Sequence, residues 1–116
     1  MSEIEIWHNP RCSKSRAALE LLTARGFAPR VVAYLEDPPT SERLDQVLAM
    51  LGMQPRELMR KSEPPYRELG LDDASLDRAT LIRAMAEHPI LIERPVVIAH
   101  GRAVVGRPPE RVLDVL

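Results

Sequence analysis

The stretch "EIEIWHNPRCSKSRAALELLTARGFAPRVVAYL", residues 3–35, carries the signals for a strand, a helix and a second strand in close succession. Charged and apolar residues alternate over 3–7, which is the period of a β-strand with one face buried. Residues 13–26 follow a helical pattern that ends at Gly26, a residue suited to the left-handed conformation after a helix. The run "RVVAYL" at 30–35 is a second β pattern. Because the joins are short, we expect a βαβ unit with parallel strands.

The middle of the chain predicts helices separated by prolines and glycines. Residues 41–51 place apolar side chains at the i, i+3, i+4 and i+7 positions of one helical face. Thr40 or Ser41 is the expected N-cap, and Gly52 is the expected stop. A second, short helix is expected to open at Pro55, because proline fits the first turn of a helix.

The segment "SEPPYRELGL", residues 62–71, is expected to be a loop. After it, Asp77 is a candidate N-cap for a helix over 78–88, which Pro89 would end. The remainder predicts a strand, a two-residue turn at His100 and Gly101, another strand and a closing helix that begins near Pro108.

This order is the layout of a thioredoxin-like fold. The α/β architecture combines a βαβ half with a β-hairpin and a C-terminal helix, and a helical insert at about 40–88 separates the two halves. With 116 residues, of which 45% are hydrophobic, the chain is the size of one domain with a single core. We therefore expect a single thioredoxin-like domain over 1–116.

Charge and hydropathy exclude several classes of protein. The net charge is -1, from 16 basic and 17 acidic residues, which gives no general affinity for nucleic acid or anionic membranes. No apolar run is long enough to span a bilayer, and "MSEIEIW" lacks the basic start and apolar stretch of a signal peptide. The sequence predicts a cytoplasmic protein that binds neither nucleic acid nor membrane.

Cys12 is the single cysteine of the chain, so an internal disulfide is excluded. It lies just before the expected first turn of a helix, where free N–H groups and the helix dipole stabilise a thiolate. His8 could add a positive charge or a hydrogen bond, and the Ser15 hydroxyl could turn back toward the sulfur. A lone cysteine is most often a small buried hydrophobe. The polar neighbours "NPRCSKS" favour a reactive thiol here.

Ser15 also occupies the position where a dithiol oxidoreductase carries its second cysteine. The motif is therefore C-x-x-S, and an adduct formed on Cys12 cannot be resolved from within the chain. The chemistry that this motif predicts is monothiol.

Four motifs together resemble the glutaredoxin-linked arsenate reductase family: "HNPRCSKSR" at 8–16, "LGMQPRELMRK" at 51–61, "ILIERPVV" at 90–97 and "GRPPERVLDVL" at 106–116. The resemblance covers nearly the whole chain and is nearer to the branch without an obvious arsenic-resistance role. It implies a thioredoxin-like fold with no bound cofactor. It also implies reduction of arsenate or a related oxyanion, with glutathione as co-substrate and glutaredoxin as partner.

The same resemblance implies roles for individual residues. Cys12 is the nucleophile, His8 supports its ionisation and Ser15 hydrogen-bonds the thiolate. Three arginines would hold the oxyanion, namely Arg60, Arg94 and Arg107. Pro95 would be structural at the site, because in thioredoxin-like folds the peptide before this proline is cis and faces the thiol.

Other residues have simpler interpretations. Fourteen of the basic residues are arginines, so any one arginine taken at random is expected to be a solvated surface residue. Trp7 and Tyr34 are expected in the core, and His88 and His100 have no metal-ligand spacing, so no metal site is predicted.

Two functions from different classes follow. The first is a monothiol oxyanion reductase with Cys12 as the nucleophile. The second is a thioredoxin-like binding protein or transcription regulator in which Cys12 is a redox sensor. A C-x-x-S motif and three candidate arginines favour the enzyme.

Overall fold

The computed structural model describes residues 3–116, which fall into two compact units. The sheet unit contains residues 3–37 and 94–116, and the helical unit contains residues 38–93. The helical unit therefore interrupts the sheet unit between its βαβ half and its hairpin half. Each unit is described below by itself.

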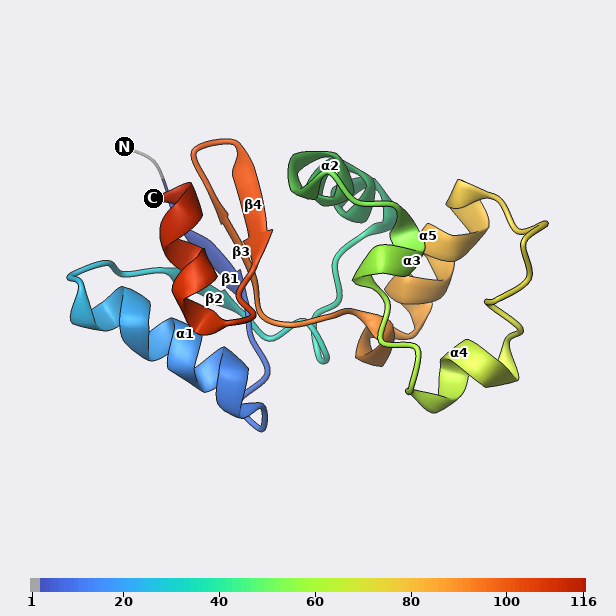
Figure 1. The fold of residues 1–116 in the computed structure, drawn as a ribbon, viewed down its shortest axis with the longest axis horizontal. Helices are drawn as coiled ribbons and strands as arrows, with labels where there is room; N and C mark the ends of the chain where they lie inside the picture. The colour runs from blue at the N-terminus through green and yellow to red at the C-terminus, as the bar shows by residue number, and fades with distance from the viewer. Residues whose placement is uncertain (1–2) are drawn as a thin grey trace. The chain divides into compact units, whose positions relative to one another are not determined.

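A four-stranded sheet with strand order β2-β1-β3-β4 forms the sheet unit (Figure 1). Its strands are β1 (Glu5–Trp7), β2 (Arg30–Val32), β3 (Val96–Ala99) and β4 (Arg102–Val105). β1 and β2 are parallel, whereas β1–β3 and β3–β4 are antiparallel. The predicted βαβ unit, hairpin and thioredoxin-like topology are thus confirmed.

Helix α1 (Ser13–Ala24) and the 3-10 helix η2 (Pro109–Val115) lie side by side in the sheet unit (Figure 1). Their apolar residues share one core with residues of the sheet: Ile4, Ile6, Ala18, Leu22, Val97, Ala99, Val104, Val112 and Val115. This core fixes where α1 begins relative to the strands. The closing helix was predicted near Pro108, and it is a 3-10 rather than an α-helix.

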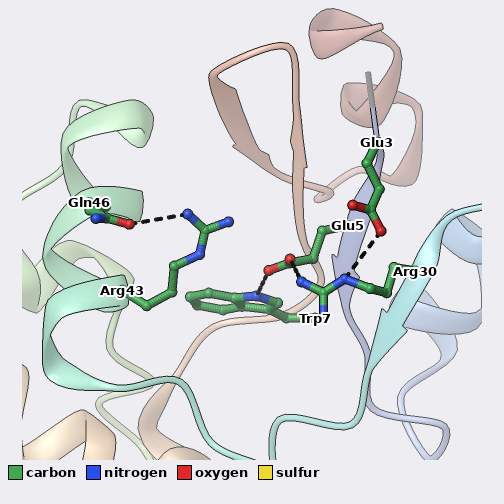
Figure 2. A network of polar contacts seen from close by, with 6 residues as sticks. All are labelled: Glu3, Glu5, Trp7, Arg30, Arg43 and Gln46. Carbon is green, nitrogen blue, oxygen red and sulfur yellow. Dashed lines mark hydrogen bonds and ion pairs between the residues drawn. The ribbon is translucent and has the colours of Figure 1, made fainter. Parts of the chain in front are cut away.

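Strand β1 is buried on both faces, which corrects the expectation of one buried face. Glu5 is only 8% exposed. Its carboxylate accepts a hydrogen bond from Trp7 Nε1 at 2.8 Å and forms an ion pair with Arg30 (Figure 2). Arg30 Nε also lies 3.4 Å from Glu3 Oε1. Because a buried carboxylate is stable only with such partners, the charged residue at this position does not mark a solvent face.

Strand β2 is shorter than predicted, because the chain turns after Val32. The N–H groups of Glu36 and Asp37 both donate to the Ala33 carbonyl, so residues 33–37 form a turn. The hairpin turn is at His100 and Gly101, as predicted, and both have positive φ (55° and 71°). A two-residue turn of this kind matches the twist of the flanking strands.

The helical unit contains four α-helices and one 3-10 helix: α2 (Ser41–Leu51), α3 (Pro55–Leu58), α4 (Pro64–Glu68), α5 (Arg78–Glu87) and η1 (Pro89–Leu91). The predicted caps are confirmed. Thr40 Oγ1 accepts from the Arg43 N–H at 3.1 Å, and Asp77 Oδ1 accepts from the Thr80 N–H at 2.9 Å. Gly52 ends α2 in the left-handed conformation. Within α2, Arg43 Nη1 donates to Gln46 Oε1 at 3.3 Å (Figure 2).

Helix α4 corrects the prediction of a loop over 62–71. Pro64 and Pro65 occupy the first two helical positions after the N-cap Glu63. Proline lacks an N–H, but the N–H groups of the first helical turn have no intrahelical acceptor in any case. The pair of prolines therefore starts a helix here. No helix in residues 3–116 is both long and apolar enough to cross a membrane.

Candidate active site

The sheet unit places Cys12 at the N-cap of α1. Its backbone is extended (φ -95°, ψ 122°), and Ser13 is the first helical residue, as predicted. The Cys12 carbonyl accepts the N–H of Arg16 at 3.0 Å, which begins the helix. Because Cys12 is the N-cap residue, it lies next to the N–H groups of the first turn of α1, which have no acceptor within the helix.

Asn9 shapes the loop that presents Cys12. Its carbonyl accepts the Cys12 N–H at 3.0 Å, and its Oδ1 accepts the Arg11 N–H, also at 3.0 Å. Arg16 Nη1 donates to the Pro10 carbonyl at 2.8 Å, which ties the loop to the helix that follows it. The loop is therefore held from both sides by its own hydrogen bonds.

Opposing effects set the ionisation of Cys12. Burial raises the pKa of the thiol, because only 8% of the residue is exposed. Hydrogen bonds from the Ser15 and Lys14 N–H groups lower it, and so do the charge and a hydrogen bond of Arg94. Together these donors outweigh burial, so the pKa of Cys12 lies below its ordinary value, as predicted. The residue is more buried than expected, but its neighbours are polar donors.

His8 and Ser15 share a hydrogen bond beside the cysteine. Ser15 Oγ lies 2.6 Å from His8 Nδ1 and also accepts the Asn9 N–H at 3.0 Å. The Ser15 hydroxyl therefore holds the loop, while the Ser15 backbone N–H is the group that faces the thiolate. Burial and the positive charge of Arg16 lower the pKa of His8, which keeps the imidazole neutral at pH 7.

Arg94 and Arg107 come from the second half of the sheet unit. The Arg94–Pro95 peptide is cis, which confirms the prediction, and the Arg107–Pro108 peptide is also cis. Arg107 Nη1 donates to the Arg94 carbonyl at 3.3 Å, and the Gly106 N–H donates to the Pro95 carbonyl at 2.9 Å. The turn after β4 is thereby fastened to the segment that carries Arg94 toward Cys12.

Arg60 lies in the helical unit, just after α3. Its N–H donates to the Leu91 carbonyl at 2.7 Å. The guanidinium binds two carboxylates of the same unit: Nη1 lies 2.6 Å from Glu63 Oε1, and Nε lies 3.9 Å from Glu93 Oε1. An oxyanion that binds Arg60 would therefore compete with these two acidic side chains.

Several residues that shape the site were missed from the sequence. The Asn9–Pro10 pair is a recognised turn signal and could have indicated the loop. Arg16 had no such signal, since its contact with the Pro10 carbonyl depends on where the loop folds. Among residues 3–116, no group of three or more His, Cys, Asp or Glu side chains could hold a metal ion.

Comparison with known proteins gives the relatives of this chain. Residues 7–115 match the ArsC family. An arsenate reductase of Neisseria meningitidis serogroup A is 53% identical over 117 residues, which cover 100% of both chains. Protein YfgD of Escherichia coli K12 is 51% identical, covering 98% of this chain and 97% of its own. The chain belongs to the ArsC family.

A solved structure shows that the similarity also holds for the fold. An arsenate reductase from Vibrio cholerae superposes with a TM-score of 0.96 at 50% identity, covering 98% of each chain. This agreement confirms the thioredoxin-like fold of the ArsC chain.

Proposed function

We propose that this ArsC-family chain reduces arsenate to arsenite with glutathione and glutaredoxin as electron donors, and that Cys12 is the nucleophile. The observation that carries the proposal is the position of Cys12 at the N-cap of α1, where backbone N–H groups and Arg94 lower the pKa of its thiol. A thiolate is the reactive form of cysteine, and a lowered pKa makes it available at neutral pH. Relatives named arsenate reductase at 53% and 46% identity support the choice of substrate.

The first step is attack of the Cys12 thiolate on arsenic. An S–As bond forms, and one arsenate oxygen leaves as water after it has taken up protons. Arsenic remains pentavalent in this adduct. The developing charge on the remaining oxygens needs preorganised donors, and arginine supplies them in a planar fork. Arg94 lies beside the sulfur and Arg107 beside Arg94, so both support this role. Arg60 is included on the family resemblance.

The second step moves two electrons. A glutathione thiolate attacks the Cys12 sulfur, and the S–As bond breaks with its electron pair going to arsenic. Arsenite leaves, and Cys12 is joined to glutathione in a mixed disulfide. Because the chain has no second cysteine, a glutaredoxin thiolate must then attack the glutathione sulfur and release Cys12 as a thiolate.

Turnover of arsenate with glutathione and glutaredoxin tests this function. We expect sustained arsenite production that Cys12→Ser abolishes, and mass spectrometry after a single turnover should show glutathione or the product on Cys12. Sustained reduction by thioredoxin without glutathione would contradict the monothiol scheme. Loss of activity in Cys12→Ser alone would not identify the electron donor, so the thioredoxin reaction is the decisive control.

The organisation of the chain belongs to the same proposal. We infer that residues 1–116 form one thioredoxin-like domain, with a helical insert at about 40–88. We also infer that the protein acts in the cytoplasm. The compact helical unit over 38–93 and the absence of a membrane-crossing helix in residues 3–116 are compatible with both inferences.

A further inference from the structure

Two positive residues next to Cys12 in the sequence have no part in the steps above. Arg11 precedes the cysteine, and Lys14 lies in the first turn of α1; both are exposed. The residues that the structure describes offer neither side chain a hydrogen bond or an ion pair. Their charges are therefore available to a molecule that approaches the thiol.

Nearby acidic residues do not neutralise this pair. The first turn of α1 contains no acidic residue, and the first carboxylate along the helix is that of Glu20. Two arginines elsewhere in the sheet unit, Arg30 and Arg111, already have acidic partners. Arg30 pairs with Glu3 and Glu5, and Arg111 Nε lies 3.2 Å from Asp114 Oδ2. A carboxylate that binds Arg11 or Lys14 thus has no ion pair within residues 3–116 to break.

We propose that Arg11 and Lys14 bind the carboxylates of glutathione while its sulfur reacts at Cys12. This inference rests on the proposed function, which supplies glutathione as the co-substrate. Glutathione carries a carboxylate at each end and a thiol between them, and its net charge is negative. Two exposed cations on either side of Cys12 in the sequence complement that arrangement. Exposed charges of this kind act mainly on the rate of encounter and lose their effect in salt.

The test uses a reaction of the intact protein that needs neither arsenate nor glutaredoxin. The Cys12 thiolate attacks glutathione disulfide, the S–S bond breaks, one glutathione remains on Cys12 and the other leaves as a thiolate. Cystamine, a disulfide that carries positive charges, reacts with Cys12 in the same way. The ratio of the two rates reports the preference for an anionic disulfide. It cancels any change in the thiolate fraction, because the same sulfur attacks both reagents.

The variants are the double charge reversal Arg11→Glu/Lys14→Glu and the matched control Arg25→Glu. Arg25 is an exposed cation at the opposite end of α1, about 18 Å away at 1.5 Å per residue. At low ionic strength we expect the double reversal to lower the glutathione disulfide to cystamine ratio by about tenfold or more. The control should keep the wild-type ratio. In about 0.5 M salt the difference between wild type and the double variant should largely disappear.

An unchanged ratio in the double variant would overturn the inference, and so would an equal fall in Arg25→Glu, which would indicate the general field of the protein. Reaction with cystamine shows in the same experiment that each variant still presents a folded, reactive Cys12. If arsenate is not reduced but the ratio falls as expected, the proposed substrate is wrong and the recognition of glutathione stands. A fall in turnover without a fall in the ratio would count against Arg11 and Lys14.

Discussion

Cys12 shows how several modest donors overcome one larger opposing effect. Burial is the largest single influence on the thiol pKa and raises it, yet the net pKa is lowered. Two of the opposing groups are backbone N–H groups of α1, which no side-chain substitution removes. Arg94 is the contributor that can be removed cleanly, because it comes from the other half of the sheet unit.

At this scale we predict that Arg94→Ala raises the alkylation midpoint of Cys12. Removing the positive charge and hydrogen bond of Arg94 favours the neutral thiol, so the pKa of Cys12 rises. His8→Ala should raise it less, because the lowered pKa of His8 leaves the imidazole uncharged at pH 7. The measurement is the pH dependence of the reaction with iodoacetamide. Arg111→Ala is the control, and a midpoint shared by Arg94→Ala and wild type would contradict the assignment.

At the scale of elements, the sequence predicts best where one signal acts locally. Asp77 and Gly52 were identified correctly, and Thr40 was one of the two candidate caps, since a capping oxygen and a left-handed glycine act within one turn. The helix at Pro64 was missed because a proline pair is a signal for both loops and helix starts. The burial of Glu5 was also missed, because the partner Arg30 lies on another strand. The periodicity of one strand does not show which residues of another strand will pair with it.

Gly106 provides a prediction for the connection between β4 and η2. A Cβ at this position would lie 3.0 Å from Pro95 Cγ and 3.0 Å from Val112 Cγ1. Gly106→Ala should therefore lower the free energy of unfolding by about 1–3 kcal/mol, measured in urea. Because Pro95 follows Arg94, the alkylation midpoint of Cys12 should also shift. Gly70→Ala is the control for the alkylation midpoint. A Cβ at position 70 would meet nothing within 4 Å, so this variant is strained only by its φ of +63° and should leave the midpoint of Cys12 unchanged. Unchanged stability in Gly106→Ala would exclude the tight packing.

The cap of α5 provides a pH-dependent prediction. Hydrogen bonds from the Thr80 hydroxyl and N–H lower the pKa of Asp77. A carboxyl whose pKa is lower in the folded state stabilises the protein above its unfolded pKa of about 3.9, and that contribution is lost as pH falls through the folded pKa. Wild type should therefore have a higher urea midpoint than Asp77→Asn at pH 7, and the gap should close in acid. Asp72→Asn serves as the control, and a gap independent of pH would contradict this linkage.

At the scale of the whole molecule, the sequence order of the elements was sufficient to predict the topology. The βαβ half and the hairpin half were each recognised from local patterns, and a thioredoxin-like sheet is what joins them. The roles of the distant arginines came from the family resemblance, because fourteen arginines in one chain make each of them individually uninformative. Their assignment to oxyanion binding stays a prediction.

Anion-dependent stability tests that prediction in the intact chain. In Cys12→Ser, which cannot react, arsenate or sulfate should raise the melting temperature, since a ligand at 100 times its Kd stabilises the native state by about 2.7 kcal/mol. Arg60→Ala, Arg94→Ala and Arg107→Ala should each reduce this rise, whereas Lys61→Ala, an exposed neighbour of Arg60, should not.

Variants of these arginines distinguish the reductase from the binding protein when turnover is measured with Cys12 present. Arg94→Lys keeps the charge but loses the planar fork, so the rate should fall by about tenfold or more, which corresponds to roughly 1.4 kcal/mol of transition-state stabilisation.

Glu63→Gln removes a carboxylate that competes for Arg60 and should strengthen anion binding only while Arg60 is present. A wild-type anion response in Arg60→Ala would remove Arg60 from the site. Wild-type turnover in all three alanine variants would reject the pocket and favour a binding protein with Cys12 as its redox sensor.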